Sequence, residues 1–335
     1  MKKQLWKHFS LGLLLLTLCY SCKDISTPKN DNTVSIIRYD KLQNDFVNFN
    51  SFASLHKMKT KYTQETKLLY EDVLNLGAVN NQDIDRLLKE HFSKPVYQKL
   101  MKDAIEKYDN MEEIEKEITA SFHLLKKAIP RIEIPTIYAQ VSGLNESVVI
   151  GNKILGFSID KYMGENYSLY QYHYYDYQRH TMSKDFIVPD CLFYFLISEM
   201  PLYENAKNHN CLEVLTYYGK IYYIMHAIDK KKSIEDFLGY SKQERKWCKE
   251  NVKKIWTYMS NKNHLKATDP YIIRSYCKLA PFTNFFGEAS PSRIGMWIGY
   301  QLVDSYMKAH KEVTLKDLFE NTNYQEIAVS AHFKP

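Results

Sequence analysis

The chain has 335 residues, of which 45% are hydrophobic and 25% charged, and its formal net charge at pH 7 is +6. Three of the 45 basic residues fall within the first 22 positions, so the remaining 313 residues carry 42 basic and 39 acidic side chains, a balance of +3. This weak excess, with no basic stripe interleaved with aromatic residues, argues against a nucleic-acid partner. The length leaves room for one large domain or two small ones.

The first 22 residues have the composition of an export signal. Three lysines precede an apolar run at residues 11–18, which is shorter than the ~20 residues that a membrane-spanning helix needs. The run leads into Leu18-Cys19-Tyr20-Ser21-Cys22, which resembles a bacterial lipobox, although Cys19 stands where Leu is usual. We therefore predict cleavage before Cys22 and attachment of lipid to that cysteine. The alternative is an ordinary signal peptide followed by an incidental cysteine.

A lipidated Cys22 would carry a diacylglycerol thioether and an N-acyl chain, and stable anchoring requires more than one such hydrophobic chain. The residues that follow, 23–33, are mostly polar, as expected of a flexible tether. The predicted location is the cell envelope, with the protein anchored to a membrane by its N-terminal lipid and facing the periplasm or the cell surface. Its expected partners are that membrane and other envelope proteins.

Residues 36–129 have mainly helical periodicity. The clearest stretch is 111–129, where apolar residues recur at steps of three and four with Glu and Lys between them, and Pro130 follows directly. Residues 57–76 and 83–88 have the same pattern more weakly. This part of the chain is therefore predicted to be helical.

The middle of the chain changes to strand patterns. Residues 133–141, 147–150 and 154–159 are short apolar stretches, and Gly151-Asn152-Lys153 forms a turn between the last two. We predict a small sheet of three or four strands that includes this hairpin. A tyrosine-rich segment follows, which is predicted to be a strand or loop packed on the domain because tyrosine suits half-buried surfaces; its members are Tyr167, Tyr170, Tyr172, Tyr174, Tyr175 and Tyr177.

Helical patterns return after Pro189, at residues 191–200, 210–228, 242–259 and 291–309, and residues 281–291 are predicted to form a loop with exposed phenylalanines. Helices, then a small sheet, then helices indicate an α+β class. We predict a single, mostly helical α+β domain at residues 34–335. The widely spaced cysteines lack a C-x-x-C pair, which argues against a zinc ribbon and leaves disulfides and free buried thiols both open; they are Cys191, Cys211, Cys248 and Cys277.

The order of these elements resembles that of a zincin metallopeptidase, in which H-E-x-x-H on a helix after the sheet binds zinc. This chain has no H-E-x-x-H motif, and Gly219-Lys220-x-x-Tyr223 occupies the expected place. Several other blocks, in this order and spacing, are specific: Ile37-Arg38-Tyr39-Asp40, Tyr162-Met163-Gly164, Ile187-Val188-Pro189-Asp190-Cys191, Tyr217-Tyr218-Gly219-Lys220, Ala280-Pro281-Phe282 and Ser290-Pro291-Ser292-Arg293-Ile294-Gly295-Met296-Trp297-Ile298-Gly299. With these blocks the chain resembles the gliding-motility lipoprotein B family (GldB) of the Bacteroidota.

This resemblance implies a zincin-like fold with a degenerate metal site, and residues 219–223 on a central helix that faces the sheet. It also implies a role in gliding motility or its secretion machinery. The missing ligand triad favours a non-catalytic lipoprotein, with no metal, no cofactor and no identifiable small-molecule substrate. Glycine offers no ligand at the first metal position, and tyrosine is a poor zinc ligand. The alternative is a zincin-related hydrolase whose site was rebuilt around Lys220, Tyr223 and Glu250.

The predicted functional face consists of Lys220, Tyr223, Glu250, Arg293 and Trp297. We expect Ser290 to cap a helix that opens at Pro291, with Arg293 and Trp297 on one face of it. Glycines at 295 and 299 would allow close helix packing. Arg293 is expected to pair with a buried acid, Glu250 or Glu288. The isolated histidines 173, 180 and 226 are interpreted as surface or packed residues.

Overall fold

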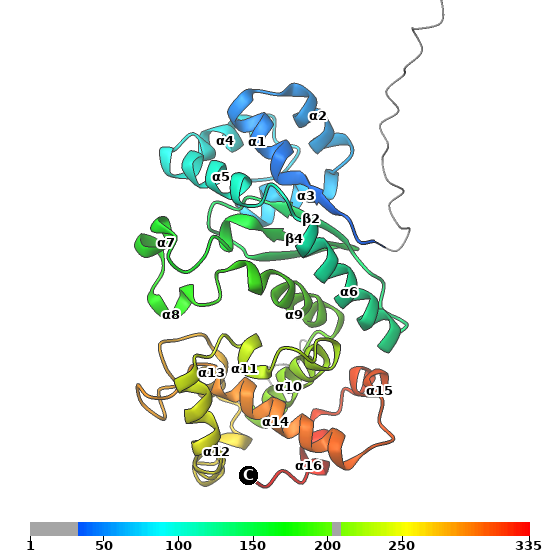
Figure 1. The fold of residues 1–335 in the computed structure, drawn as a ribbon, viewed down its shortest axis with the longest axis vertical. Coiled ribbons are helices and arrows are strands. Elements are labelled where there is room, and N and C mark those ends of the chain that lie inside the picture. The colour runs from blue at the N-terminus through cyan, green and yellow to red at the C-terminus, as the bar shows by residue number, and fades with distance from the viewer. Residues whose placement is uncertain (1–32, 203–208) are drawn as a thin grey trace, which may run out of the picture. The chain divides into compact units, whose positions relative to one another are not determined.

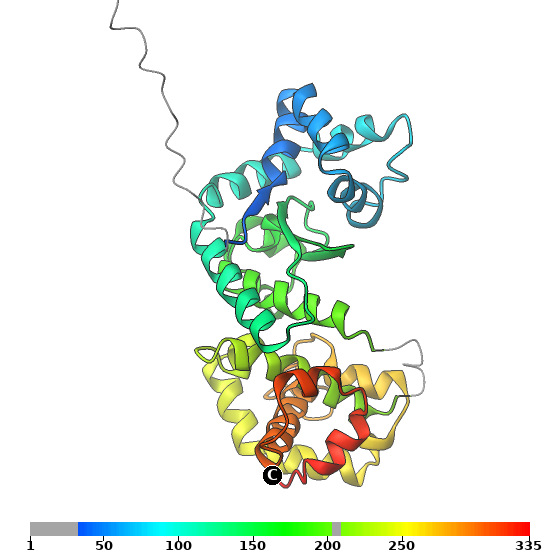
Figure 2. The same ribbon diagram turned by 90° about the vertical axis from the view of Figure 1, so that its right-hand side faces the viewer.

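The computed structural model describes residues 33–202 and 209–335, and Figures 1 and 2 show their fold from two sides. The predicted signal peptide, Cys22 and the tether as far as residue 32 lie outside the described residues. The described residues form helices and one four-stranded sheet, so the predicted α+β class is confirmed. In this part of the chain, no helix is both long enough and apolar enough to cross a bilayer.

Between the first and second strands the chain is helical. The elements are α1 (Tyr39–Phe49), α2 (Phe52–Thr60), α3 (Thr63–Lys67), a π-helical turn (Leu68–Val73), α4 (Ile84–Phe92), α5 (Pro95–Lys107) and α6 (Glu112–Ala128). Helix α6 confirms the prediction for residues 111–129, because its buried positions Ile114, Ile118, Phe122 and Leu125 lie three or four residues apart. Three glutamates in its first turn complement the helix dipole, and it ends just before Pro130.

The sheet has the strand order β1-β2-β4-β3. Strands β1 (Ile36–Arg38), β2 (Thr136–Gln140) and β4 (Ile154–Ser158) are parallel, and β3 (Val148–Gly151) pairs antiparallel with β4, which confirms the predicted hairpin. Residues 36–38 were expected in a helical region and instead form an edge strand. They do so because they pair with β2, a partner distant in sequence that local periodicity cannot reveal.

Helices cover both faces of the sheet. Helix α1 contacts β2, and α9 (Ile187–Glu199) contacts β3 and β4. Figure 1 shows α1 to α5 on one side of the sheet and α9 on the other. The residues of α9 are apolar around most of the helix, as expected of a helix enclosed between two layers. Beyond the sheet, α9 also contacts α6 and α10.

The tyrosine-rich segment forms two short helices, α7 (Ser168–His173) and α8 (Asp176–Arg179), so the predicted strand or loop is wrong. Tyr170 is buried, and its hydroxyl donates to the carbonyl oxygen of Asp160 at 2.5 Å. The Tyr174 hydroxyl donates to the carbonyl oxygen of Leu144 at 2.7 Å. These side chains fasten the segment to the end of the sheet, as the half-buried character of tyrosine allows.

The C-terminal part is helical. After α9 it contains α10 (Cys211–Ile228), α11 (Ile234–Phe237), α12 (Lys242–Asn261), α13 (Pro270–Cys277), α14 (Ile294–Ala309), α15 (Leu315–Glu320) and α16 (Tyr324–Ser330). Helices α9, α10 and α12 confirm three predicted helices to within a few residues. Asn210 and Ser241 cap α10 and α12 and form reciprocal hydrogen bonds with Glu213 and Glu244, respectively.

The loop before α14 and the four cysteines show how far side chains in these helices and loops are buried. Residues 281–291 form the predicted loop, but its phenylalanines are half-buried rather than exposed, and the Phe285 ring lies 4.9 Å from that of Tyr276. The four cysteines beyond the predicted signal are free and buried. Burial raises the pKa of the Cys211 thiol to about 12, which keeps it protonated and unreactive.

Candidate functional site

Helix α10, which carries Gly219, packs directly on α14 through glycines. A Cβ atom at Gly219 would lie 2.2 Å from the carbonyl oxygen of Gly299. A Cβ atom at Gly299 would lie 1.9 Å from the carbonyl oxygen of Leu215, and one at Gly295 would lie 2.6 Å from the Leu215 side chain. The two helix backbones are therefore in contact, and the prediction that Gly295 and Gly299 allow close helix packing is confirmed.

The prediction that residues 219–223 face the sheet is wrong. Helix α10 packs most extensively on α14 and also contacts α16 and α9, whereas α9 is the helix that contacts β3 and β4. Figure 1 shows α9 between the sheet and α10. Both helices are largely apolar, so hydrophobic pattern alone does not distinguish the helix on the sheet from the helix behind it.

Lys220 is only 1% exposed. Its ammonium group donates to the carbonyl oxygen of Asn321 and lies 5.0 Å from the centre of the Tyr324 ring. Burial lowers the pKa of Lys220 from its ordinary value of about 10.5 to about 7. The side chain therefore contacts α16 and the residues before it, where a backbone carbonyl holds it.

Tyr223 and Trp297 contact other partners. The half-buried Tyr223 ring lies 6.1 Å from the ring of Tyr300 on α14. Trp297 is buried, and its Nε1 donates to Oε1 of Glu235 at 3.0 Å. These contacts join α10 and α11 to α14, which is a packing role.

Arg293 does not pair with either of the acids predicted for it. Glu250 lies on the exposed side of α12, 3.8 Å from Lys246, and Glu288 is also exposed. Arg293 Nη2 instead donates to the carbonyl oxygen of Leu238 at 2.6 Å, and its buried Nε has no hydrogen-bond partner among the described residues. The predicted ion pair is wrong, and the five residues of the predicted face do not converge on one site.

The start of α14 also differs from the prediction. The helix begins at Ile294, and Arg293 before it has a φ of +56°, in the left-handed region, which prevents the helix from extending back to Pro291. Ser290 does not cap the helix, because its hydroxyl donates to the carbonyl oxygen of Gly287 at 2.7 Å. Arg293 therefore does not share a helical face with Trp297.

Arg293 lies near an acid that the sequence reasoning missed. Asp190, in the first turn of α9, accepts a hydrogen bond from the Tyr162 hydroxyl at 2.8 Å. Burial raises the pKa of Asp190 to about 6, although the Tyr162 hydrogen bond and the charge of Arg293 both act to lower it. The available signal was an acid within the otherwise apolar residues 187–197. This cluster links the turn that follows β4, helix α9 and the residue before α14.

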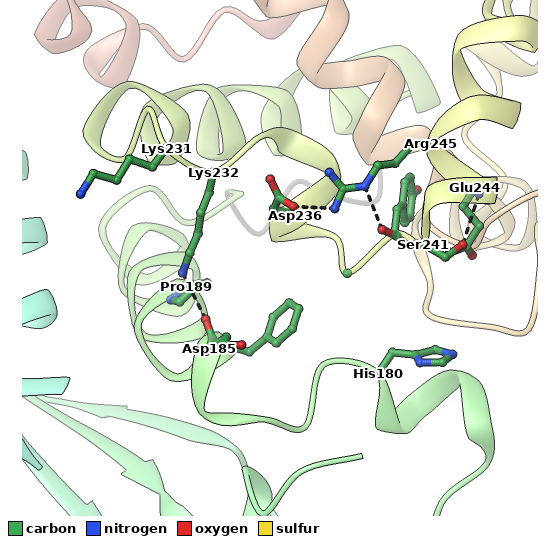
Figure 3. Close-up of a pocket in the computed structure, with 12 residues that line it drawn as sticks. His180, Asp185, Pro189, Lys231, Lys232, Asp236, Ser241, Glu244 and Arg245 are labelled. Atoms are coloured by element: carbon green, nitrogen blue, oxygen red, sulfur yellow. Dashed lines mark hydrogen bonds and ion pairs between the residues drawn. The ribbon is translucent and has the colours of Figure 1, made fainter. Parts of the chain in front are cut away.

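A cleft opens next to this cluster, between the segment from α8 to α9 and helices α11 and α12 (Figure 3). Its main cavity has a volume of about 700 Å³. A second cavity of about 300 Å³ extends from it to Arg293 and to the block Ala280-Pro281. The lining residues that the two cavities share are His180, Gly239, Tyr240 and Glu244.

The cleft walls carry charges of both signs. Lys232 Nζ donates to the carbonyl oxygen of Asp185 at 3.2 Å, and Arg245 pairs with Asp236 at 2.5 Å (Figure 3). Burial acts to raise the pKa of Asp236, but hydrogen bonds from Arg245 and Ser233 outweigh it and the pKa is lowered. The cleft therefore offers one fixed ion pair together with hydrogen-bonding groups.

The isolated histidines have ordinary environments. His226 Nδ1 lies 2.8 Å from the carbonyl oxygen of Lys232, and His180 Nδ1 lies 3.0 Å from a carboxylate oxygen of Glu165. His173 is exposed at the end of α7. Within residues 33–202 and 209–335, no group of three or more His, Cys, Asp or Glu side chains is arranged to hold a metal ion.

Comparison with known proteins identifies the chain at the level of its family. None of the curated proteins and none of the solved structures compared with it matches. The family model described as gliding motility protein GldB matches residues 21–335, which include the described sheet, the contact between α10 and α14, and the cleft. The chain therefore belongs to the GldB family of gliding motility proteins.

Proposed function

We propose that this protein is a lipid-anchored, non-catalytic component of the gliding motility machinery or its associated secretion machinery, and that it binds an envelope protein in the cleft. Membership of the GldB family supports the association with gliding. The family match begins at residue 21, directly before Cys22, which supports this cysteine as the first residue of the mature chain.

Anchoring is tested by metabolic labelling with a fatty-acid probe. The full-length chain should be labelled, and Cys22→Ala should not. Cys19→Ala is the matched control, because it removes the neighbouring cysteine of the same segment and should still be labelled. Equal labelling of the wild type and Cys22→Ala would contradict the lipid anchor.

The contact between Gly219 and Gly299 is the observation that carries the non-catalytic proposal. Position 219 corresponds to the first histidine of H-E-x-x-H in the resemblance to zincins. A side chain there would meet the backbone of α14, since its Cβ would lie 2.2 Å from a carbonyl oxygen. A metal-binding histidine would thus require α10 and α14 to separate, so this position serves helix packing.

A zincin-like ancestry with a degenerate metal site belongs to the same proposal. It is supported by the order of helices, sheet and helices, and by Gly219-Lys220-x-x-Tyr223 at the place of the motif. The packing of α10 on α14, with α9 between α10 and the sheet, departs from it.

Partner binding in the cleft is tested by reversing one charge. Lys231 is exposed and lines the main cavity, so Lys231→Glu should leave the fold intact and reduce gliding. Lys254→Glu is the matched control, because this exposed lysine on α12 lies outside the two cavities of the cleft. Colony spreading of a gliding strain that lacks its own copy is the measurement. Equal spreading of both variants would contradict the proposal that the cleft binds a partner protein.

A second candidate function is a hydrolase rebuilt around Lys220, Tyr223 and Glu250. The pKa of about 7 favours it, because a neutral lysine can act as a general base. Against it, Lys220 lines neither cavity of the cleft, and its side chain is held by the carbonyl of Asn321. Glu250 lies on the exposed side of α12, paired with Lys246.

A further inference from the structure

Two phenylalanines are strongly exposed at the turn between α1 and α2. Phe49 is 73% exposed and Phe52 is 76% exposed, and they flank the two-residue link Asn50-Ser51. We call residues 49–52 the phenylalanine turn. Its rings add little to the stability of the fold, because most of their surface stays in water. Large apolar side chains exposed together are typical of an interaction surface.

The phenylalanine turn is held rigidly by the helices on either side. Asn50 has a φ of 55°, and its backbone N–H donates to the carbonyl oxygen of Asp45. Lys89 Nζ donates to Oδ1 of Asn50 at 2.6 Å. Ser51 caps α2 by accepting from the backbone N–H of Ser54, whose hydroxyl donates to Asp45 at 3.3 Å. The two rings are therefore presented by a fixed backbone.

Exposed lysines outnumber acids around the turn. Residues 45–65 contain three exposed lysines, the half-buried Asp45 and the buried Glu65. Of the three lysines, Lys59 pairs with Asp85 at 2.5 Å, and the other two are Lys57 and Lys61. Lys89 Nζ lies 6.0 Å from the centre of the Phe52 ring. Aromatic rings beside lysines match a bilayer surface, where the rings enter the apolar boundary and the ammonium groups meet lipid phosphates.

We propose that the phenylalanine turn is a membrane-contact element that inserts Phe49 and Phe52 into the surface of an anionic bilayer. The proposal rests on the proposed anchor at Cys22. Residues 23–33 can span at most about 36–40 Å when extended. Strand β1 and helix α1 together extend about 27 Å from the end of that segment to the turn. The tether thus permits the turn to reach the membrane that holds Cys22.

The experiment uses the mature chain, residues 22–335, with Cys22→Ala so that no lipid contributes. It is mixed with vesicles of phosphatidylethanolamine and phosphatidylglycerol, and in parallel with phosphatidylcholine vesicles, and bound protein is measured by flotation. We expect binding to the anionic vesicles. The double variant Phe49→Ser/Phe52→Ser should bind at least about tenfold more weakly, because both inserted rings are lost.

Two further double variants make the test specific. Lys57→Gln/Lys61→Gln should weaken binding to the anionic vesicles by about fivefold per lysine at low salt. Tyr172→Ser/Tyr175→Ser is the matched control, because these rings are 84% and 73% exposed but lie in and after α7. It should bind as the wild type does. All variants should keep the wild-type urea midpoint, since the altered side chains are exposed.

The proposal is overturned if the wild type does not bind anionic vesicles, or if the phenylalanine variant binds as well as the wild type. An equal loss in the tyrosine control would also overturn it. A failure of the proposed lipid anchor would be detected in a different measurement, because fatty-acid labelling at Cys22 does not depend on the phenylalanine turn. An unlabelled chain whose vesicle binding still requires Phe49 and Phe52 would refute the anchor and leave the membrane contact supported.

Discussion

Replacing Lys220 by methionine should stabilise the protein at neutral pH. The side chain is buried, and its pKa is about 7 in the folded chain compared with about 10.5 when exposed. At ~1.36 kcal/mol per pH unit, this difference corresponds to about 5 kcal/mol against the charged form. Lys220→Met removes that penalty but leaves the carbonyl of Asn321 without its donor, a loss of about 1–3 kcal/mol. The variant should be about 2–4 kcal/mol more stable at pH 6.

The pH dependence has a definite sign. Between pH 7 and pH 10.5 the unfolded chain holds the Lys220 proton and the folded chain does not, so wild-type stability rises with pH through this window. The penalty is fully present below pH 7. The advantage of Lys220→Met should therefore shrink by about 2.5 kcal/mol between pH 6 and pH 9.

Urea unfolding of the wild type and Lys220→Met at several pH values between 6 and 9 measures this difference. The other titratable groups are present in both proteins, so their contributions to the pH dependence of stability cancel in the difference. Lys254→Met is the matched control for the substitution itself, because this lysine is exposed. A pH-independent difference between the wild type and Lys220→Met would refute the reasoning, since Lys220 would then keep its proton in the folded chain.

Three other variants test the same region. Gly219→Ala should lose about 2 kcal/mol or more in urea unfolding, because its Cβ would lie 2.2 Å from the Gly299 carbonyl oxygen; an unchanged midpoint would contradict the backbone contact. Asp190, with a pKa of about 6 against about 4 unfolded, should make wild-type stability fall by about 2 kcal/mol as pH rises from 4 to 6. Asp190→Asn should not show that fall in the same titration, and a parallel fall in both proteins would refute the burial of this carboxyl. Trp297→Phe should lower the free energy of unfolding by about 1–3 kcal/mol, because it removes the hydrogen-bond donor to the buried Glu235. A melting temperature equal to that of the wild type would show that this hydrogen bond does not stabilise the fold.

Local sequence patterns predicted the elements of the fold well where the signal itself is local. The spacing of apolar residues gave α6, and Gly151-Asn152-Lys153 gave the hairpin between β3 and β4. Patterns could not reveal β1, whose pairing partner is distant in sequence, nor which of α9 and α10 lies on the sheet. Both depend on tertiary contacts: the first on the pairing of β1 with β2, and the second on the packing of two largely apolar helices.

The candidate site was less predictable than the fold. Glycine spacing correctly indicated the close packing at Gly295 and Gly299, because this effect needs only the absence of a side chain. The position of Arg293 depends on a left-handed backbone that follows a proline turn, which helical periodicity does not register. Asp190 in the first turn of α9 looks like a residue placed for the helix dipole, and only the fold brings Tyr162 and Arg293 to it.

We propose that this GldB family protein acts through binding at its cleft and does no chemistry at Lys220. The most direct test is colony spreading of a gliding strain in which Lys220→Met replaces the wild-type chain. Because this variant is expected to be more stable than the wild type, a loss of function could not be attributed to unfolding. We expect this strain to spread as the wild type does. Abolished spreading, with wild-type amounts of the variant in the membrane fraction, would contradict this proposal and favour a rebuilt hydrolase site.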